Sequence, residues 1–158
     1  MPAEFDGFSI AHISDLHNAE FGKDNEKLIS ILREENPNII ALTGDLIDSN
    51  HTNIEIALSF VRQAVEIAPC YYVTGNHEAW IGSQYDEMKA ALEKMGVVVL
   101  EDEAVKLEYG GASIQLIGLN DPAFAEREAF LAKSILETKL SQVNIEDGYT
   151  VLLSHRPE

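Results

Sequence analysis

Short apolar runs and amphipathic segments alternate over residues 8–95. They indicate strands and helices in turn, at 8–14, 25–35, 39–42, 54–67, 71–73 and 84–95. Pro37 and Pro69 follow the first two helices, and Gly96 is placed to end the third. This alternation predicts right-handed crossovers and a parallel sheet, with the first strand buried on both of its faces.

The pattern changes after Gly96, where strands follow one another closely. Further strands are expected at 97–100, 105–108, 114–119 and 150–153, with a long helix at 125–142. Gly110 and Gly111 lie between two of these strands and are typical of a hairpin turn. The sequence therefore predicts an α/β fold with a parallel half and an antiparallel half. Because it contains no linker or repeat, we expect a single domain over residues 1–158.

Composition excludes several classes of function. The chain has 158 residues, of which 46% are hydrophobic and 24% charged, as is usual for a soluble globular protein with a sizeable core. Only 11 basic residues stand against 27 acidic ones, which gives a formal net charge of −16. This charge argues against non-specific binding to nucleic acid or anionic lipid, which depends on Lys and Arg. An anionic substrate would need a local positive centre, which bound metal can provide.

Cysteine content and hydropathy add little chemistry. Cys70 is the single cysteine, so no intrachain disulfide can form, and we interpret it as a buried, inert thiol. No apolar run reaches the roughly 18 residues of a membrane helix. Residues 1–6 lack the basic start and apolar stretch of a signal peptide. We expect the chain as given to be soluble.

Four short polar clusters follow apolar runs and carry the chemistry of this sequence. They are residues 15–17 (DLH), 44–48 (GDLID), 75–78 (GNHE) and 154–155 (SH). Parallel strands that end on one edge of a sheet bring distant residues into one crevice. Carboxylate, imidazole and amide donors suit Mn, Fe or Zn more than Ca, and the lack of thiolate disfavours a structural zinc cage. Each Asp alone would fit a turn or a helix cap. The ordered set instead predicts a metal site.

The clusters resemble those of the calcineurin-like metallophosphoesterases, in particular the small bacterial members. Motifs of that family run D-x-H, G-D-x-x-D, G-N-H-D/E, a later H and finally G-H-x-H, and the first four occur here in order. The resemblance implies an α/β/β/α sandwich and a phosphatase or phosphodiesterase that acts on small-molecule or lipid-like phosphate esters. In such an enzyme a hydroxide bound to a dinuclear metal centre attacks phosphorus.

The resemblance also implies a role for each matching residue. Two residues would bind the first metal, one would bridge, and two would bind the second: Asp15 and His17, then Asp45, then Asn76 and His155. His77 would not bind metal but would face the leaving-group oxygen as general acid, oriented by Asp48. Glu78 would support its loop. This division suits the chemistry, because an alkoxide leaving group needs a proton and histidine titrates near neutral pH.

The sequence ends at Glu158, before any G-H-x-H motif. We therefore expect a shortened form of a longer enzyme, with an incomplete sandwich that lacks C-terminal strands and one ligand for each metal. Such a form would be weak or inactive, and its exposed sheet surface would favour homo-oligomers. Members of this subgroup often begin with a membrane anchor, so the longer form would be cytoplasmic or membrane-associated.

Two other functions stay open at this stage. A non-catalytic scaffold on the same fold would be free to lose metal ligands, and a metal-storage or sensor protein would bind metal without cleaving esters. Among the remaining residues, His12 is expected as a hydrogen-bonded core histidine and His51 as a loop residue. Trp80 and Tyr85 could either line the pocket or pack on the third helix.

Overall fold

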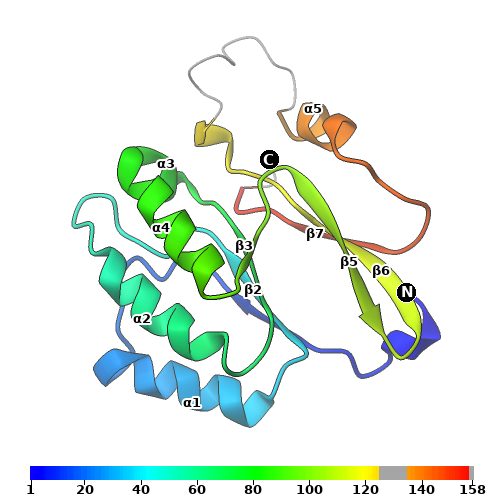
Figure 1. Ribbon diagram of the computed structural model, residues 1–158, viewed down its shortest axis with the longest axis horizontal. Helices are drawn as coiled ribbons and strands as arrows, with labels where there is room; N and C mark the ends of the chain where they lie inside the picture. The colour runs from blue at the N-terminus through cyan, green and yellow to red at the C-terminus, as the bar shows by residue number, and fades with distance from the viewer. Residues whose placement is uncertain (125–134, 157–158) are drawn as a thin grey trace.

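The computed structural model describes residues 1–124 and 135–156, which form two stacked sheets with helices on their outer faces (Figure 1). The first sheet is parallel and has the order β1 (Ile10–Ile13), β2 (Ile39–Thr43), β3 (Cys70–Val73), β4 (Val98–Val99). The second sheet has the order β5 (Glu103–Tyr109), β6 (Ala112–Gly118), β7 (Thr150–Leu153). The predicted α/β/β/α architecture is confirmed.

The helices are α1 (Glu26–Glu35), α2 (Ile54–Ala64), α3 (Asn76–Trp80), α4 (Ser83–Lys94) and α5 (Ile135–Gln142). Short 3-10 turns are η1 (Ala3–Phe5), η2 (Lys23–Asn25) and η3 (Pro122–Phe124). α1, α2 and α4 cover one face of the first sheet, and α5 lies beside the second sheet (Figure 1). Of the predicted helix at 125–142, residues 125–134 lie outside the described residues, and the remainder is α5.

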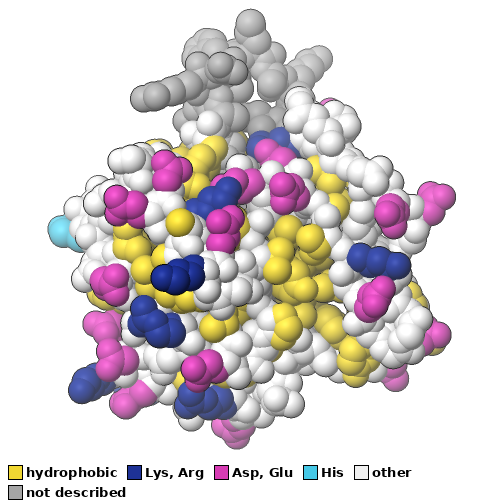
Figure 2. All heavy atoms as spheres, viewed as in Figure 1, with side chains coloured by type: hydrophobic (Ala, Val, Ile, Leu, Met, Phe, Trp, Pro, Cys, Tyr) yellow, Lys and Arg dark blue, Asp and Glu magenta, His cyan; other side chains and the backbone are white. Residues whose placement is uncertain are grey.

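Two buried clusters divide the core at β2. Ile40 and Leu42 pack towards the helices, whereas Ile39 and Ala41 pack towards the second sheet. All five residues of β2 are buried, as expected for a parallel strand covered on both faces. Acidic side chains are spread over the face in Figure 2, in keeping with the negative charge of the sequence.

β1 differs from the prediction that it is buried on both faces. Among the described residues it pairs only with β2, so it is an edge strand, and its residues alternate between exposed and half-buried. His12 is accordingly exposed and not a core histidine, although its Nε2 lies 2.6 Å from the hydroxyl oxygen of Thr43. Cys70 is buried as predicted, and burial raises the pKa of its thiol to about 12.

The structure also differs from the prediction for the region after Gly96. The sequence pattern groups β4 with the close-set strands, yet β4 joins the first sheet in parallel with β3. β5 and β6 form the predicted hairpin, with Gly110 and Gly111 at its turn and both at positive φ. β7 pairs with β6 in parallel, so the second half is mixed and not antiparallel. A connection long enough to contain α5 permits that parallel pairing, and strand spacing alone does not reveal it.

Within the described residues, no helix combines the length and the apolar character needed to cross a lipid bilayer.

The two sheets come closest at Gly118, which makes a prediction. A Cβ at this position would lie 2.2 Å from Cβ of Leu100 and 2.7 Å from Cγ1 of Val73. Gly118→Ala should therefore lower the free energy of unfolding by about 1–3 kcal/mol through overpacking. Urea denaturation measures the loss, with Ser113→Ala on the same strand as the control. An unchanged midpoint would show that the sheets can move apart without cost.

Candidate metal centre

The loops that follow β1 and β2 run side by side at the carboxyl edge of the first sheet. The N–H of Asp15 donates to the carbonyl of Gly44 at 3.2 Å, and the N–H of His17 donates to the carbonyl of Asp45 at 2.9 Å. Three side chains of the centre lie on residues with positive φ: Asp15, His17 and Asp45. This backbone conformation is rare for residues with a Cβ and marks a constrained, site-forming loop.

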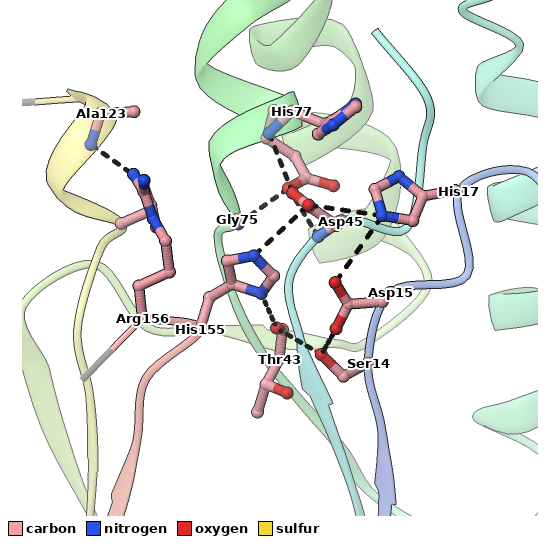
Figure 3. Close-up of polar contacts among 12 residues, drawn as sticks. Ser14, Asp15, His17, Thr43, Asp45, Gly75, His77, Ala123, His155 and Arg156 are labelled. Carbon is pink, nitrogen blue, oxygen red and sulfur yellow. Dashed lines mark hydrogen bonds and ion pairs between the residues drawn. The ribbon is translucent and has the colours of Figure 1, made fainter. Parts of the chain in front are cut away.

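Asp45 lies at the middle of the centre and is buried (Figure 3). Its Oδ2 is 3.6 Å from Nε2 of His17 and 3.3 Å from Nε2 of His155, and its Oδ1 accepts the N–H of His77 at 2.9 Å. Burial by itself raises the pKa of Asp45, but the hydrogen bonds from His155 and from the His77 N–H outweigh it and bring the pKa below the usual value. Asp45 is therefore an ionised carboxylate held between imidazoles.

Asp15 stands at the open side of this centre. Its Oδ1 is 3.6 Å from Nε2 of His17, and its Oδ2 accepts a hydrogen bond from Ser14. The Asp15 side chain is 55% exposed whereas that of Asp45 is 4% exposed. A ligand or substrate can therefore reach the centre from the side of Asp15.

His155 comes from the second sheet, shortly after the end of β7. Its Nδ1 lies 2.8 Å from the carbonyl of Thr43, which can only accept, so Nδ1 donates and Nε2 points to Asp45. The hydrogen bond with Asp45 raises the pKa of His155 to about 9. Without a cation the ring is therefore protonated at neutral pH, and metal binding must displace that proton. A backbone acceptor on one ring nitrogen is the usual support of a metal-binding histidine.

Two sets of side chains can each hold a metal ion. One set is His17, Asp45 and His77, the other is Asp15, Asp45 and His155, and in each set the ligand atoms lie within 4.8 Å of one another. Asp45 belongs to both, as expected of a bridging ligand. The sets differ from the division implied by the resemblance, because His155 groups with Asp15 and because His77 offers a ligand atom. The individual roles of these residues stay predictions.

Asn76, the fifth predicted ligand, is the first residue of α3 and lies between two residues that contact Asp45. Before it, Gly75 approaches so closely that a Cβ there would lie 2.2 Å from Oδ1 of Asp45. After it, His77 donates its N–H to the same oxygen. The backbone thus carries Asn76 to the edge of the centre. The sequence did not predict α3 itself, because a five-residue helix is too short to show periodicity.

Glu78 is the buried link between the loops that carry this centre. Its carboxylate accepts three backbone N–H groups, from Asp45 at 2.9 Å, Leu46 at 2.9 Å and Gly75 at 2.7 Å. Burial raises its pKa, while these donors stabilise the charged form. Glu78 supports its loop, as the sequence predicts, and it also fixes the loop that carries Asp45.

His77 has both Ser49 and Asp48 next to its Nδ1. The backbone N–H of Ser49 donates to its Nδ1 at 3.0 Å, whereas Oδ1 of Asp48 lies 3.5 Å away, beyond a good hydrogen bond. Asp48 instead accepts from the N–H of Asn50 at 2.9 Å, and this hydrogen bond lowers its pKa. The hydroxyl oxygen of Ser49 also lies 3.1 Å from Nδ1 of His77, and the sequence motifs did not single Ser49 out.

A second position that the sequence did not single out is Asp121. Its buried carboxylate binds the guanidinium of Arg156, with Nε to Oδ2 at 2.7 Å, and also accepts the N–H of Ala123 at 2.8 Å. Because Arg156 follows His155 directly, this pair fixes the chain just beyond β7. Asp121 stands two residues after the predicted strand at 114–119, so its place at a strand end is the signal that could have found it.

Tyr85, Trp80 and His51, all near the centre, differ in how far they are exposed. Tyr85 is buried on α4 and donates its hydroxyl to Glu101 at 2.6 Å, so it packs within the fold. Trp80 is 60% exposed at the end of α3 and its ring contacts His77. The side chain of His51 is 89% exposed, and its Nδ1 lies 3.6 Å from Oδ2 of Asp48.

Comparisons with known proteins agree with the architecture. The family model for calcineurin-like phosphoesterases matches residues 8–158. The uncharacterised metallophosphoesterase YkoQ of Bacillus subtilis is 28% identical over 153 residues, which are 94% of this chain and 53% of that protein. A transmembrane protein with a metallophosphoesterase domain from Danio rerio is 24% identical, over 99% of this chain and 37% of its own length.

Solved structures share the fold. The phosphopantetheinyl hydrolase PptH of Mycobacterium tuberculosis superposes with a TM-score of 0.53 at 20% identity, covering 69% of this chain and 41% of that one. A protein of Thermus thermophilus gives a TM-score of 0.54 at 18% identity, covering 71% and 48%. The chain thus spans about half the length of YkoQ, and its match covers less than half of either solved structure.

The hydrogen bonds of Glu78 predict a specific loss of stability. In Glu78→Gln one acceptor oxygen becomes an NH₂ group, so at least one buried N–H of the two loops loses its partner. We expect the free energy of unfolding to fall by about 1–3 kcal/mol. Urea denaturation measures this, with the exposed Glu93→Gln on α4 as the matched control. Equal midpoints for both variants would show that the loops hold together without this carboxylate.

The position of Asp45 predicts a loss of metal binding. Asp45→Asn removes the charged ligand common to both sets, and the affinity for Mn²⁺ should fall by more than about 100-fold, beyond the usual effect of a supporting residue. Equilibrium dialysis of the apoprotein measures binding, and circular dichroism confirms that the variant is folded. Asp147→Asn at an exposed position should bind like the wild type. Unchanged affinity in Asp45→Asn would exclude Asp45 as a shared ligand.

Proposed function

The chain belongs to the calcineurin-like phosphoesterase family, and we propose that it hydrolyses phosphate esters with two divalent cations bound at this centre. The observation that carries the proposal is the position of Asp45. This buried carboxylate belongs to both sets of candidate ligands, which is the arrangement that two adjacent cations require. The chemistry of the donors, carboxylate and imidazole without thiolate, favours Mn, Fe or Zn.

The residues present fit such a pair of cations. Carboxylates of Asp15 and Asp45 supply negative charge, and His155 presents Nε2 towards Asp45 while a carbonyl holds Nδ1. When bound, the cations would neutralise the charge on phosphoryl oxygens and activate a water molecule for attack on phosphorus. In a chain with a net charge of −16, they would also provide the local positive centre that an anionic substrate needs.

Although His77 offers a ligand atom, we assign to it the delivery of a proton to the leaving oxygen and not a place on a cation. With Ser49 N–H donating to Nδ1, the neutral ring carries its proton on Nε2. Nδ1 of His77 also lies 3.1 Å from the hydroxyl oxygen of Ser49 and 3.5 Å from Oδ1 of Asp48. Ser49 and Asp48 would thus hold the ring in place while it delivers the proton.

The substrate is proposed only as a phosphate mono- or diester, of a small molecule or a lipid-like compound. A non-catalytic scaffold and a metal store or sensor are the competing functions. Hydrolysis of ethyl phosphate and of nitrophenyl phosphate in the presence of Mn²⁺ distinguishes an enzyme from a scaffold or a metal store. Metal bound at this centre with no cleavage of these monoesters or of the diester bis(nitrophenyl) phosphate would overturn the proposed phosphoesterase.

The same pair of substrates tests His77. Ethanol is a poor leaving group and needs a proton, whereas nitrophenolate leaves without one. His77→Ala should therefore reduce kcat for ethyl phosphate by about 10²–10⁴-fold and for nitrophenyl phosphate far less. His51→Ala, which removes another imidazole next to Asp48, should leave the ratio of the two rates unchanged. Equal losses on both substrates in His77→Ala would count against His77 as the acid.

A further inference from the structure

Trp80 lies near the metal centre and is unusually exposed for a tryptophan. It is the single tryptophan of the chain, and 60% of it is exposed, although large aromatic side chains are mostly buried in folded proteins. It ends α3, four residues after Asn76, and therefore lies on the same short helix as His77. An exposed indole at this place is available to a bound molecule.

Three aromatic rings are in contact one after another, from His17 through His77 to Trp80. The rings of His17 and His77 have centroids 4.5 Å apart at 74°, and those of His77 and Trp80 have centroids 5.0 Å apart at 48°. His17 lies 3.6 Å from Asp45 and its side chain is 36% exposed, that of His77 is 15% exposed, and Trp80 is 60% exposed. A group that leaves from phosphorus next to His77 would therefore have the indole within reach.

We propose that Trp80 is the specificity-determining residue of this site, and that it stacks on a planar aromatic ring carried by the leaving alcohol of the phosphate ester. This inference rests on the proposed function, because it requires the leaving group to depart at His77. The ester class that fits is one whose alcohol bears an aryl or heteroaryl ring close to the phosphate.

The surroundings of Trp80 favour a compact ring over a long acyl chain. Beyond the helix, Gly82, Ser83 and Gln84 are exposed and carry no apolar side chain, so the apolar surface ends shortly after the indole on that side. η3 lies beside α3, and there Phe124 is 36% exposed in edge contact with Tyr85 at 5.0 Å. Among the described residues of this rim, Trp80 and Phe124 offer exposed rings to a ligand.

Binding of substrate-like phosphonates tests the proposal without any turnover. Phenylphosphonate and methylphosphonate carry the same anionic head and differ in the ring. In the presence of Mn²⁺, calorimetry should show phenylphosphonate binding about tenfold tighter to the wild type, as expected for one aromatic stacking contact. The preference should fall to near one in Trp80→Ala and persist in part in Trp80→Phe. Ile31→Ala, at an exposed apolar position on α1, should keep the full preference.

Fluorescence adds a signature that a merely structural role would not produce. Because Trp80 is the single tryptophan, phenylphosphonate should quench the intrinsic emission with the midpoint found by calorimetry, and methylphosphonate should quench it much less. Equal affinities in the wild type, or a preference that survives in Trp80→Ala, would overturn the role of Trp80 and leave the phosphoesterase intact. Hexylphosphonate binding tighter than phenylphosphonate would overturn it in favour of an acyl chain.

Failure of the proposed function gives a different result. If neither phosphonate binds in the presence of Mn²⁺ and no ester is cleaved, the phosphoesterase and the role of Trp80 both fall. Among active forms, benzyl phosphate and ethyl phosphate both release an alkoxide, so leaving-group strength does not dominate their comparison. The KM for benzyl phosphate should rise about tenfold in Trp80→Ala, with kcat changing far less. A loss confined to kcat would contradict a binding role.

Discussion

The buried carboxylate of Glu78 is the interaction on which this centre depends. Removing an ion from water is costly, and three backbone N–H groups offset that cost here. Those donors belong to the loop after β2 and the loop before α3, so one side chain ties both loops together. Only glycine permits the resulting closeness, since Gly44 and Gly75 face each other at a distance that leaves no room for a Cβ on either. This backbone arrangement places the Asp45 side chain between His17 and His155.

The second sheet contributes through packing. β7 lies parallel to β6, and Gly118 of β6 sits directly against Leu100 and Val73 without a side chain between them. This close contact sets the second sheet at the depth where the segment after β7 reaches Asp45. His155 thereby joins Asp45, which precedes it by more than a hundred positions in the sequence. The metal centre is thus a product of both sheets, and the distance between them governs its geometry.

Most residues of this centre could be predicted from the sequence, because the ends of the strands can be recognised in it. Apolar runs that stop at Asp15, at Gly44 and before Gly75 place their polar neighbours on one edge, once the sheet is known to be parallel. Features that depend on backbone contacts could not be predicted in this way. The N–H of Ser49 donates to His77, and every residue but proline has such a group, although the Ser49 hydroxyl lies near the same nitrogen. The exposure of β1 depends on its place in the sheet order. The parallel pairing of β7 depends on a long-range contact that no local pattern encodes.

Electrostatics explains why such a centre should bind cations and not merely tolerate its charges. Three aspartates, at positions 15, 45 and 48, gather on one edge of a chain that is already strongly acidic, and Glu78 adds a fourth carboxylate beneath them. Without metal, the protonated His155 supplies the positive charge next to Asp45. Its ring nitrogen can exchange that proton for a cation without moving, because a carbonyl already fixes the opposite nitrogen. The fold thus brings candidate metal ligands close together, and bound divalent ions would relieve their mutual repulsion most fully.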